Sequence, residues 1–120
     1  MPKRDKFDLE ERLIDFAASI IHIVGQMPLD KVGSHLCGQL LRSGTSPALN
    51  YGEALSAESR RDFIHKIKVV LKELRETFVC LKILVRIEYL KAGSPALVEN
   101  NELISLFVKS IDTARRNMNA

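Results

Sequence analysis

The chain has 120 residues, of which 46% are hydrophobic and 28% are charged. This is the composition of an ordinary folded domain, and it excludes a disordered chain. Eighteen Lys and Arg residues against 15 acidic residues give a net charge of +3, so a polyanionic partner is allowed but not required. We expect residues 1–120 to form one domain.

The cysteines and the hydrophobic segments indicate a reducing compartment. Cys37 and Cys80 each fall in an apolar-periodic stretch, which favours small packed side chains. No uninterrupted apolar segment follows the charged N-terminus, and the most apolar run, 16–24, is about half of the ~20 residues that span a bilayer. We therefore expect a cytoplasmic protein without a membrane partner.

The first predicted helix begins after Asp8 and ends at Gly25 and Pro28. Asp8 and Glu11 have the spacing of a capping box. The apolar residues recur at steps of three and four, as in an amphipathic helix: Leu9, Leu13, Phe16, Ala17, Ile20 and Val24. His22 lies within this stretch, and we expect a packed or half-exposed side chain there, not a metal ligand.

The second predicted helix runs from Asp30, a possible N-cap, to Leu55. A stripe of mixed donors and acceptors follows it at helical spacing: Gln39, Arg42, Ser43, Ser46, Asn50 and Glu53. This polar stripe lacks the Lys/Glu alternation of a solvated surface. It therefore predicts either an internal hydrogen-bond network or a ligand or subunit interface. Gly33, Gly38, Gly44 and Pro47 lower the helix propensity, and the small residues permit close approach of backbones.

The third predicted helix runs from about residue 57 to 90 without Gly or Pro. One arc is apolar and is expected to face the core: Phe63, Ile67, Val70, Leu71, Leu74, Phe78, Leu81 and Val85. The opposite arc is a line roughly 37 Å long of seven basic side chains: Arg61, His65, Lys68, Lys72, Arg75, Lys82 and Arg86. This basic line is either a solvated face whose charges pair with Glu58, Glu73 and Glu76, or a surface for phosphates.

A break at residues 92–94 precedes the last predicted helix, with Ser94 as its cap and Pro95 as its first residue. Its apolar positions are Leu103, Ile104, Phe107, Ile111 and Ala114. Four helices with short connections predict an all-α fold, an antiparallel up-down four-helix bundle.

Two segments carry a resemblance to a known family. The second helix contains Gln39-Leu-Leu-Arg42-Ser43-Gly-Thr-Ser46-Pro-Ala-Leu-Asn50-Tyr-Gly-Glu53-Ala, and the third contains Lys72-Glu73-Leu-Arg-Glu76-Thr77. Both resemble the bacterial four-helix bundle family whose founding members are encoded in intervening sequences of 23S rRNA genes, sometimes labelled S23 ribosomal protein. Pro47 and Gly52-Glu53-Ala54 depart from the family's commoner Asn-Ile-Ala-Glu-Gly form.

The resemblance implies an antiparallel four-helix bundle that assembles into a ring-like homopentamer. It implies no settled biochemical activity. A more distant relative, the accessory protein of diversity-generating retroelements, is a basic pentamer that binds nucleic acid and a reverse transcriptase. The polar motif Gln39, Arg42, Ser46, Asn50 and Glu53 is then a structural or interface element.

The sequence contains no catalytic, cofactor or metal signature. It has neither a phosphate-binding glycine loop nor cysteine and histidine spacing for zinc, and Asp62-x-x-His65 alone does not make a di-iron site. We therefore expect no enzyme activity, no cofactor and no metal.

Two functions remain open. One is an RNA-associated oligomer that contacts phosphates through Arg61, Lys68, Lys72, Arg75, Lys82 and Arg86. The alternative is a scaffold whose ring presents a surface to a protein partner. Few aromatic residues and no Trp disfavour sequence-specific recognition of single strands.

Overall fold

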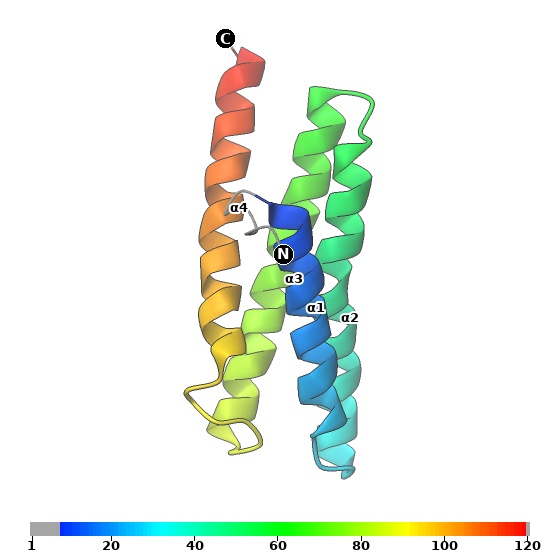
Figure 1. Cartoon of the computed structure of the whole chain (residues 1–120), viewed down its shortest axis with the longest axis vertical. Helices are drawn as coiled ribbons and strands as arrows, with labels where there is room; N and C mark the ends of the chain where they lie inside the picture. Colours follow the sequence, from blue (N-terminus) through cyan, green and yellow to red (C-terminus); the bar gives the residue numbers. More distant parts are fainter. Residues whose placement is uncertain (1–7, 120) are drawn as a thin grey trace, which may run out of the picture.

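The computed structural model describes residues 8–119 as four α-helices: α1 (Leu9–Gly25), α2 (Lys31–Leu55), α3 (Arg60–Arg86) and α4 (Pro95–Asn119). Consecutive helices run in opposite directions and pack side by side (Figure 1). Each helix packs against two others, and α1 and α3 lie on the diagonal, without contact between their backbones. The predicted antiparallel up-down four-helix bundle is confirmed.

Side-chain caps begin three of the helices. Asp8 accepts a hydrogen bond from the Glu11 N–H at 3.1 Å, and Asp30 accepts one from the Gly33 N–H at 2.6 Å. Both caps confirm the sequence prediction. Ser59 caps α3 in the same way, since its hydroxyl accepts from a backbone N–H three residues further on. These side chains satisfy backbone donors that have no partner inside the helix.

α3 is shorter than the predicted helix from 57 to 90. Its start is set by the Ser59 cap, and its end by Glu88, whose φ of 65° lies in the left-handed region. The N–H groups of Tyr89 and Leu90 both turn back to the Leu84 carbonyl. The periodicity continues past Arg86 without Gly or Pro, so the sequence pattern does not reveal this reversal.

The loop after α3 is tied to the start of α2. The Tyr89 hydroxyl donates a hydrogen bond to the Asp30 carboxylate, which also caps α2. The hydrogen bond from Tyr89 and the one from Gly33 hold the pKa of Asp30 below its usual range. The end of one helix and the beginning of another are therefore fixed by one carboxylate.

The core lies along the whole bundle axis. Its fully buried hydrophobic side chains come from all four helices: Leu13, Ile20, Leu40, Ile67, Val70, Leu74, Leu81, Leu84, Leu103 and Phe107. α3 departs from the prediction, because Phe63, Leu71, Phe78 and Val85 are only half-buried while Ile64, Thr77, Cys80 and Leu84 are buried. The reason is that α3 packs against both α2 and α4, so its buried arc is wider than one stripe.

One end of the bundle contains three helices, because α1 begins about halfway along it (Figure 1). Beside the first turn of α1, an aromatic pair spans the space between α2 and α4. The rings of Tyr51 and Phe107 meet edge to face, with centroids 5.4 Å apart and planes at 87°. This geometry is favourable for aromatic quadrupoles, so the pair joins α2 to α4 across the bundle. Among residues 8–119, no helix is long and apolar enough to cross a membrane.

α1 approaches α2 closely at Gly44. A Cβ at this buried position would lie 2.7 Å from Cγ2 of Ile20, which is itself fully buried on α1. No real side-chain carbon tolerates that distance, so glycine sets the separation of the two helices here. Gly38, two turns earlier on α2, has nothing within 4 Å of the same virtual atom.

These two glycines make a matched pair of alanine variants. We expect Gly44→Ala to lower the free energy of unfolding by about 1–3 kcal/mol, because the added methyl group overpacks the contact with Ile20. Gly38→Ala should raise it by about 0.5–1 kcal/mol, because alanine has the higher helix propensity. Urea denaturation followed by circular dichroism measures both. Equal effects of the two variants would contradict the close contact.

Candidate functional site

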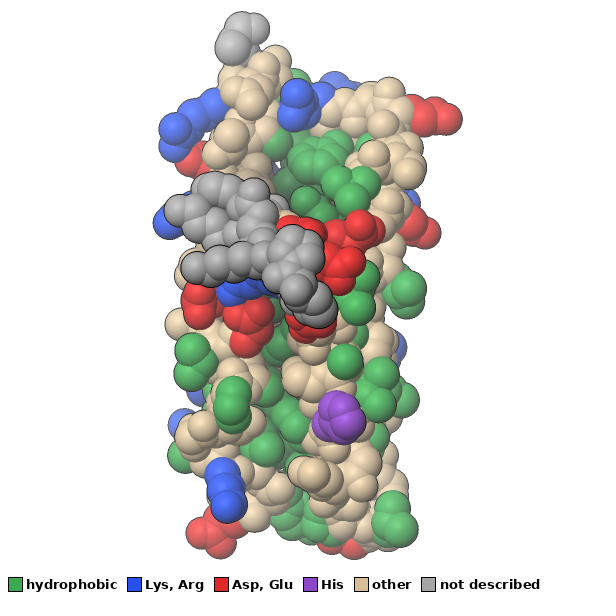
Figure 2. Space-filling model, in the orientation of Figure 1, with side chains coloured by type: hydrophobic (Ala, Val, Ile, Leu, Met, Phe, Trp, Pro, Cys, Tyr) green, Lys and Arg blue, Asp and Glu red, His purple; other side chains and the backbone are tan. Residues whose placement is uncertain are grey.

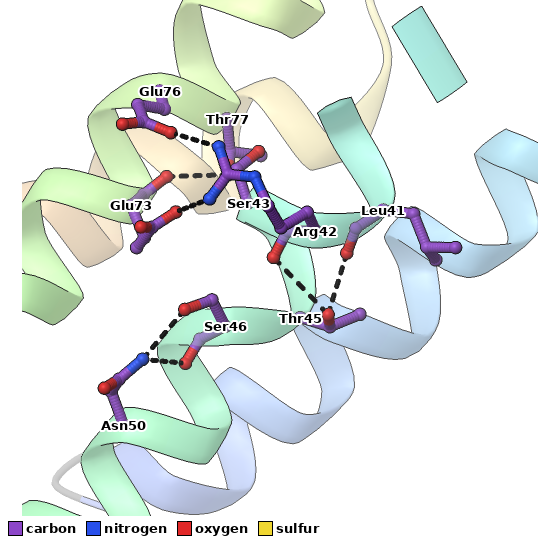
Figure 3. A network of polar contacts seen from close by, with 9 residues as sticks. All are labelled: Leu41, Arg42, Ser43, Thr45, Ser46, Asn50, Glu73, Glu76 and Thr77. Carbon is purple, nitrogen blue, oxygen red and sulfur yellow. Dashed lines mark hydrogen bonds and ion pairs between the residues drawn. The ribbon is translucent and has the colours of Figure 1, made fainter. Parts of the chain in front are cut away.

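The polar stripe of α2 faces α3, and Arg42 is its strongest connection. Its guanidinium lies 2.9 Å from a carboxylate oxygen of Glu73 and 2.6 Å from one of Glu76 (Figure 3). These contacts raise the pKa of Arg42, the hydrogen bond to Glu76 contributing most. Glu73 is almost buried, so its carboxylate depends on this partner. One cation of α2 therefore holds two acids of α3.

A buried hydroxyl pair lies beside this ion-pair cluster. The Thr77 hydroxyl is 2.8 Å from the Glu73 carbonyl oxygen and 3.0 Å from the hydroxyl of Ser43. Both side chains are buried at the contact of α2 with α3 (Figure 3). Because water does not reach them, each hydroxyl relies on the other elements of the bundle for its hydrogen bonds.

The remaining stripe residues divide into two groups. The Asn50 amide donates to the Ser46 carbonyl at 3.0 Å and to the Ser46 hydroxyl at 2.8 Å (Figure 3). Glu53 pairs with Lys66 of α3 at 3.2 Å. Gln39 is exposed, and no side chain between residues 8 and 119 forms a hydrogen bond with it. The stripe thus bonds within the bundle, apart from Gln39.

The basic line of α3 is exposed at every position. None of its six Lys and Arg side chains forms an ion pair with a carboxylate in the described part of the chain. Lys82 lies over the ring of Phe78, 5.3 Å from its centroid. Of the two alternatives for the line, pairing with Glu73 and Glu76 is not found, because Arg42 engages both of them. Eight basic against three acidic residues give α3 an excess of five positive charges.

A groove of about 830 Å³ runs between α2 and α3 alongside the basic line. Its floor is apolar, and its polar rim includes three residues of the line. The floor consists of Leu36, Leu71, Val79, Cys80 and Ile83, and the rim of Gln39, Arg42, Lys68, Lys72, Arg75 and Glu76. The groove was not predicted from the sequence. The sequence does contain a signal for it, because the hydrophobic residues Val79 and Ile83, which are 58% and 42% exposed, interrupt the basic line.

Within residues 8–119, the cysteines and the histidine of α1 form no hydrogen bond or ion pair with the polar stripe. Cys80 is buried and Cys37 half-buried, both are free thiols, and burial raises the pKa of each. His22 is exposed on the outer face of α1, so of the two expected alternatives the packed histidine is not found. Among residues 8–119, no three His, Cys, Asp or Glu side chains gather where they could hold a metal ion.

Two of the comparisons with known proteins find similar proteins. The family model described as 23S rRNA-intervening sequence protein matches residues 5–108. A crystal structure from Bacteroides thetaiotaomicron, of a protein with unknown function from the S23 ribosomal protein family, is 31% identical in sequence. The match covers 86% of this chain and 97% of that chain, with a TM-score of 0.81. No curated protein matches the chain.

The buried hydroxyl pair allows a double-mutant test. Thr77→Val keeps the shape of the side chain but leaves the Ser43 hydroxyl without its partner, so we expect a loss of about 1–3 kcal/mol in the free energy of unfolding. Adding Ser43→Ala removes the unpaired group and should recover part of that loss. The exposed Thr113→Val should change stability by less than about 0.5 kcal/mol. Strictly additive losses in the denaturation curves would contradict the pairing.

Proposed function

The chain belongs to the 23S rRNA-intervening sequence protein family, and we propose that it is a non-enzymatic, oligomeric protein that associates with RNA through the basic line of α3. A ring of five subunits is the assembly that the family resemblance favours. The names of the family and of its structural relative refer to ribosomal RNA and to a ribosomal protein, and they describe those proteins only. One observation of this chain carries the proposal: among residues 8–119, the six exposed Lys and Arg side chains of the basic line have no carboxylate partner.

Unpartnered cations in a row suit a phosphate backbone. Each phosphate that a Lys or Arg neutralises releases condensed counterions, which supplies free energy without any reading of sequence. Cations that already pair with acids gain less from this exchange. Because Arg42 removes Glu73 and Glu76 from the line, six Lys and Arg side chains along roughly 37 Å are free to make such contacts.

The charge is also distributed unevenly around the bundle. The segment 8–25, which contains α1, has four acidic residues against one Arg. Acidic side chains gather in the middle of the face that carries α1, while α3 lies behind it (Figures 1 and 2). A polyanion is therefore attracted most strongly to the side of the molecule that carries α3, which favours one binding orientation.

The basic line is better suited to contacting the phosphates of structured RNA than to recognising its bases. Its one ring is that of His65, and a single imidazole is no platform for successive stacked bases. Phosphate contacts position a protein on a nucleic acid without specifying its sequence. We therefore expect binding that depends on charge and shape, with little preference among sequences.

The second candidate function, a scaffold for a protein partner, is favoured by the groove between α2 and α3. Aliphatic side chains such as Val79 and Ile83 contribute nothing to a phosphate contact, yet they are exposed beside the cations. A protein that packs against them would bury apolar surface. The two functions differ in what they require of the cations beyond the groove.

The salt dependence of RNA binding tests the proposal. We expect Arg61→Gln with Arg86→Gln to weaken binding of structured RNA, because both side chains are exposed and neither lines the groove. The slope of log affinity against log salt should flatten by about one unit for each lost contact. Filter binding at several salt concentrations measures the slope.

The matched control removes two positive charges from α4. Lys109→Gln with Arg115→Gln, also at exposed positions, should leave the slope of the wild-type protein almost unchanged. Equal slopes for the α3 variant and the wild type would overturn the RNA proposal and leave the scaffold function.

A further inference from the structure

The groove between α2 and α3 changes character along its length. Toward the C-terminal end of α3 it is aliphatic, with Leu36, Val79 and Ile83. Toward the middle of α3 it becomes cationic, with Lys72 and Arg75 on the rim. A helix that fills this groove therefore needs aliphatic side chains at one end and an acid at the other.

The outer face of α1 has this distribution. Glu11, Ile14, Ala18 and Ile21 are all exposed and follow one another at steps of three, four and three residues, the spacing of a helix-packing seam. Ile14 and Ile21 are 47% and 52% exposed, although they are large hydrophobic side chains. The acid precedes the aliphatic residues, and Glu11 forms no ion pair in the described part of the chain. The other three helices of residues 8–119 leave these four side chains exposed.

The residues of the two surfaces lie at matching positions along the helix axes. α1 and α3 run in the same direction and end at the same end of the bundle (Figure 1). Counting back from Gly25, Glu11 lies 14 residues, Ile14 11 residues and Ala18 7 residues before the end of α1. Counting back from Arg86, three positions of α3 have the same offsets: Lys72 at 14 residues, Arg75 at 11 and Val79 at 7.

The match extends to the last turn. Ile21 and Ile83 lie four and three residues from the two helix ends, which is about 5–6 Å along either axis. Along the bundle axis, Glu11 of α1 therefore lies at the height of Lys72 of α3. Ala18 and Ile21 lie at the heights of Val79 and Ile83. The aliphatic stem of Arg75 can lie along Ile14 while its guanidinium stays in water.

We infer that α1 of one copy packs into the groove between α2 and α3 of a second copy, parallel to its α3. This inference rests on the oligomeric part of the proposed function. The two surfaces are different, so the contact is head to tail and repeats from copy to copy. Because the levels match without an axial offset, successive copies stay in one plane, and the chain of contacts closes into a ring instead of extending as a filament.

The inferred contact leaves room for RNA. Lys72 and Arg75 lie in it and are not available to RNA in the assembly, whereas Arg61 lies beyond its cationic end and Arg86 lies beside Val79 and Ile83 at its aliphatic end. Arg61→Gln alone therefore tests RNA binding without altering the contact between copies, and the two ideas can fail separately.

A charge in the aliphatic part tests the contact. We expect Ile21→Glu to convert the assembled protein to the 13.5 kDa monomer in sedimentation equilibrium, because an unpaired carboxylate would be buried against Val79 and Ile83 of the next copy. The helical circular dichroism should not change, since Ile21 is half exposed in the single subunit. The matched control Val98→Glu replaces a hydrophobic side chain of α4 that is 65% exposed, and it should leave the assembly intact.

Charge reversal tests the register. Lys72→Glu should raise the dissociation constant of the assembly about tenfold or more, because it faces Glu11 of the neighbouring copy. Adding Glu11→Lys to the same chain should restore most of the affinity. If Glu11→Lys does not restore assembly, Glu11 and Lys72 are not in contact and the inferred register is wrong.

A disulfide test locates the contact directly. In a chain with Cys37→Ala and Cys80→Ala, we expect Ala18→Cys with Val79→Cys to link successive copies covalently under mild oxidation, since the two positions share one level. Ala18→Cys with Lys72→Cys, about 10 Å out of register, should not form links.

The outcomes separate this inference from the proposed function. An Ile21→Glu protein that remains assembled, together with no Ala18–Val79 link, overturns the inferred contact while the oligomer stands. A wild-type protein that sediments as a folded monomer at micromolar concentration overturns both the oligomer and the contact. Neither result changes what the salt dependence of RNA binding says about the RNA proposal.

Discussion

The pairing of Arg42 with Glu73 and Glu76 determines how both the fold and the surface are organised. It joins the middle of α2 to the middle of α3, directly beside the buried contact of Ser43 with Thr77. The same pairing turns both acids of central α3 toward α2, away from the helix's outer face. The ion pairs that hold α2 and α3 together thus also determine which charged side chains are exposed to solvent. Fold and surface charge are not independent in this protein.

α3 is the element on which the other features converge. Because it packs against both α2 and α4, its outward arc is narrow, and the cations are concentrated in one line. Its flank toward α2 contributes the apolar residues of the groove. α1 stands on the diagonal from α3 and carries the opposite charge, which gives the bundle its acidic and basic sides. A bundle of this size can therefore present two unlike surfaces without any insertion or additional domain.

Much of the fold follows from the sequence because its signals are local. Asp8 and Asp30 mark the starts of α1 and α2, and Gly25 and Pro95 mark the end of α1 and the start of α4. The three- and four-residue steps of the apolar residues identify the buried faces. The end of α3 was missed, because the reversal at Glu88 is stabilised by bonds back to the Leu84 carbonyl and leaves no Gly or Pro in the sequence. Charge along one face was also readable, since all the predicted cations are exposed. What the sequence could not show is which acid pairs with which cation, nor that Asn100 is buried with its amide on the Leu74 carbonyl. Those facts depend on the neighbouring helix.

The short length of α1 has a consequence for motion. Local opening of a protein requires least free energy where few apolar contacts are broken, so protection against amide exchange should follow position along the bundle instead of helix identity. The end that α1 does not reach has fewer helices packed together, so it should be the less protected end. Arg61 and His65 lie there, whereas Arg86 lies where four helices pack. The basic line should thus open more readily at its Arg61 end than at its Arg86 end, a gradient that amide exchange along α3 would show.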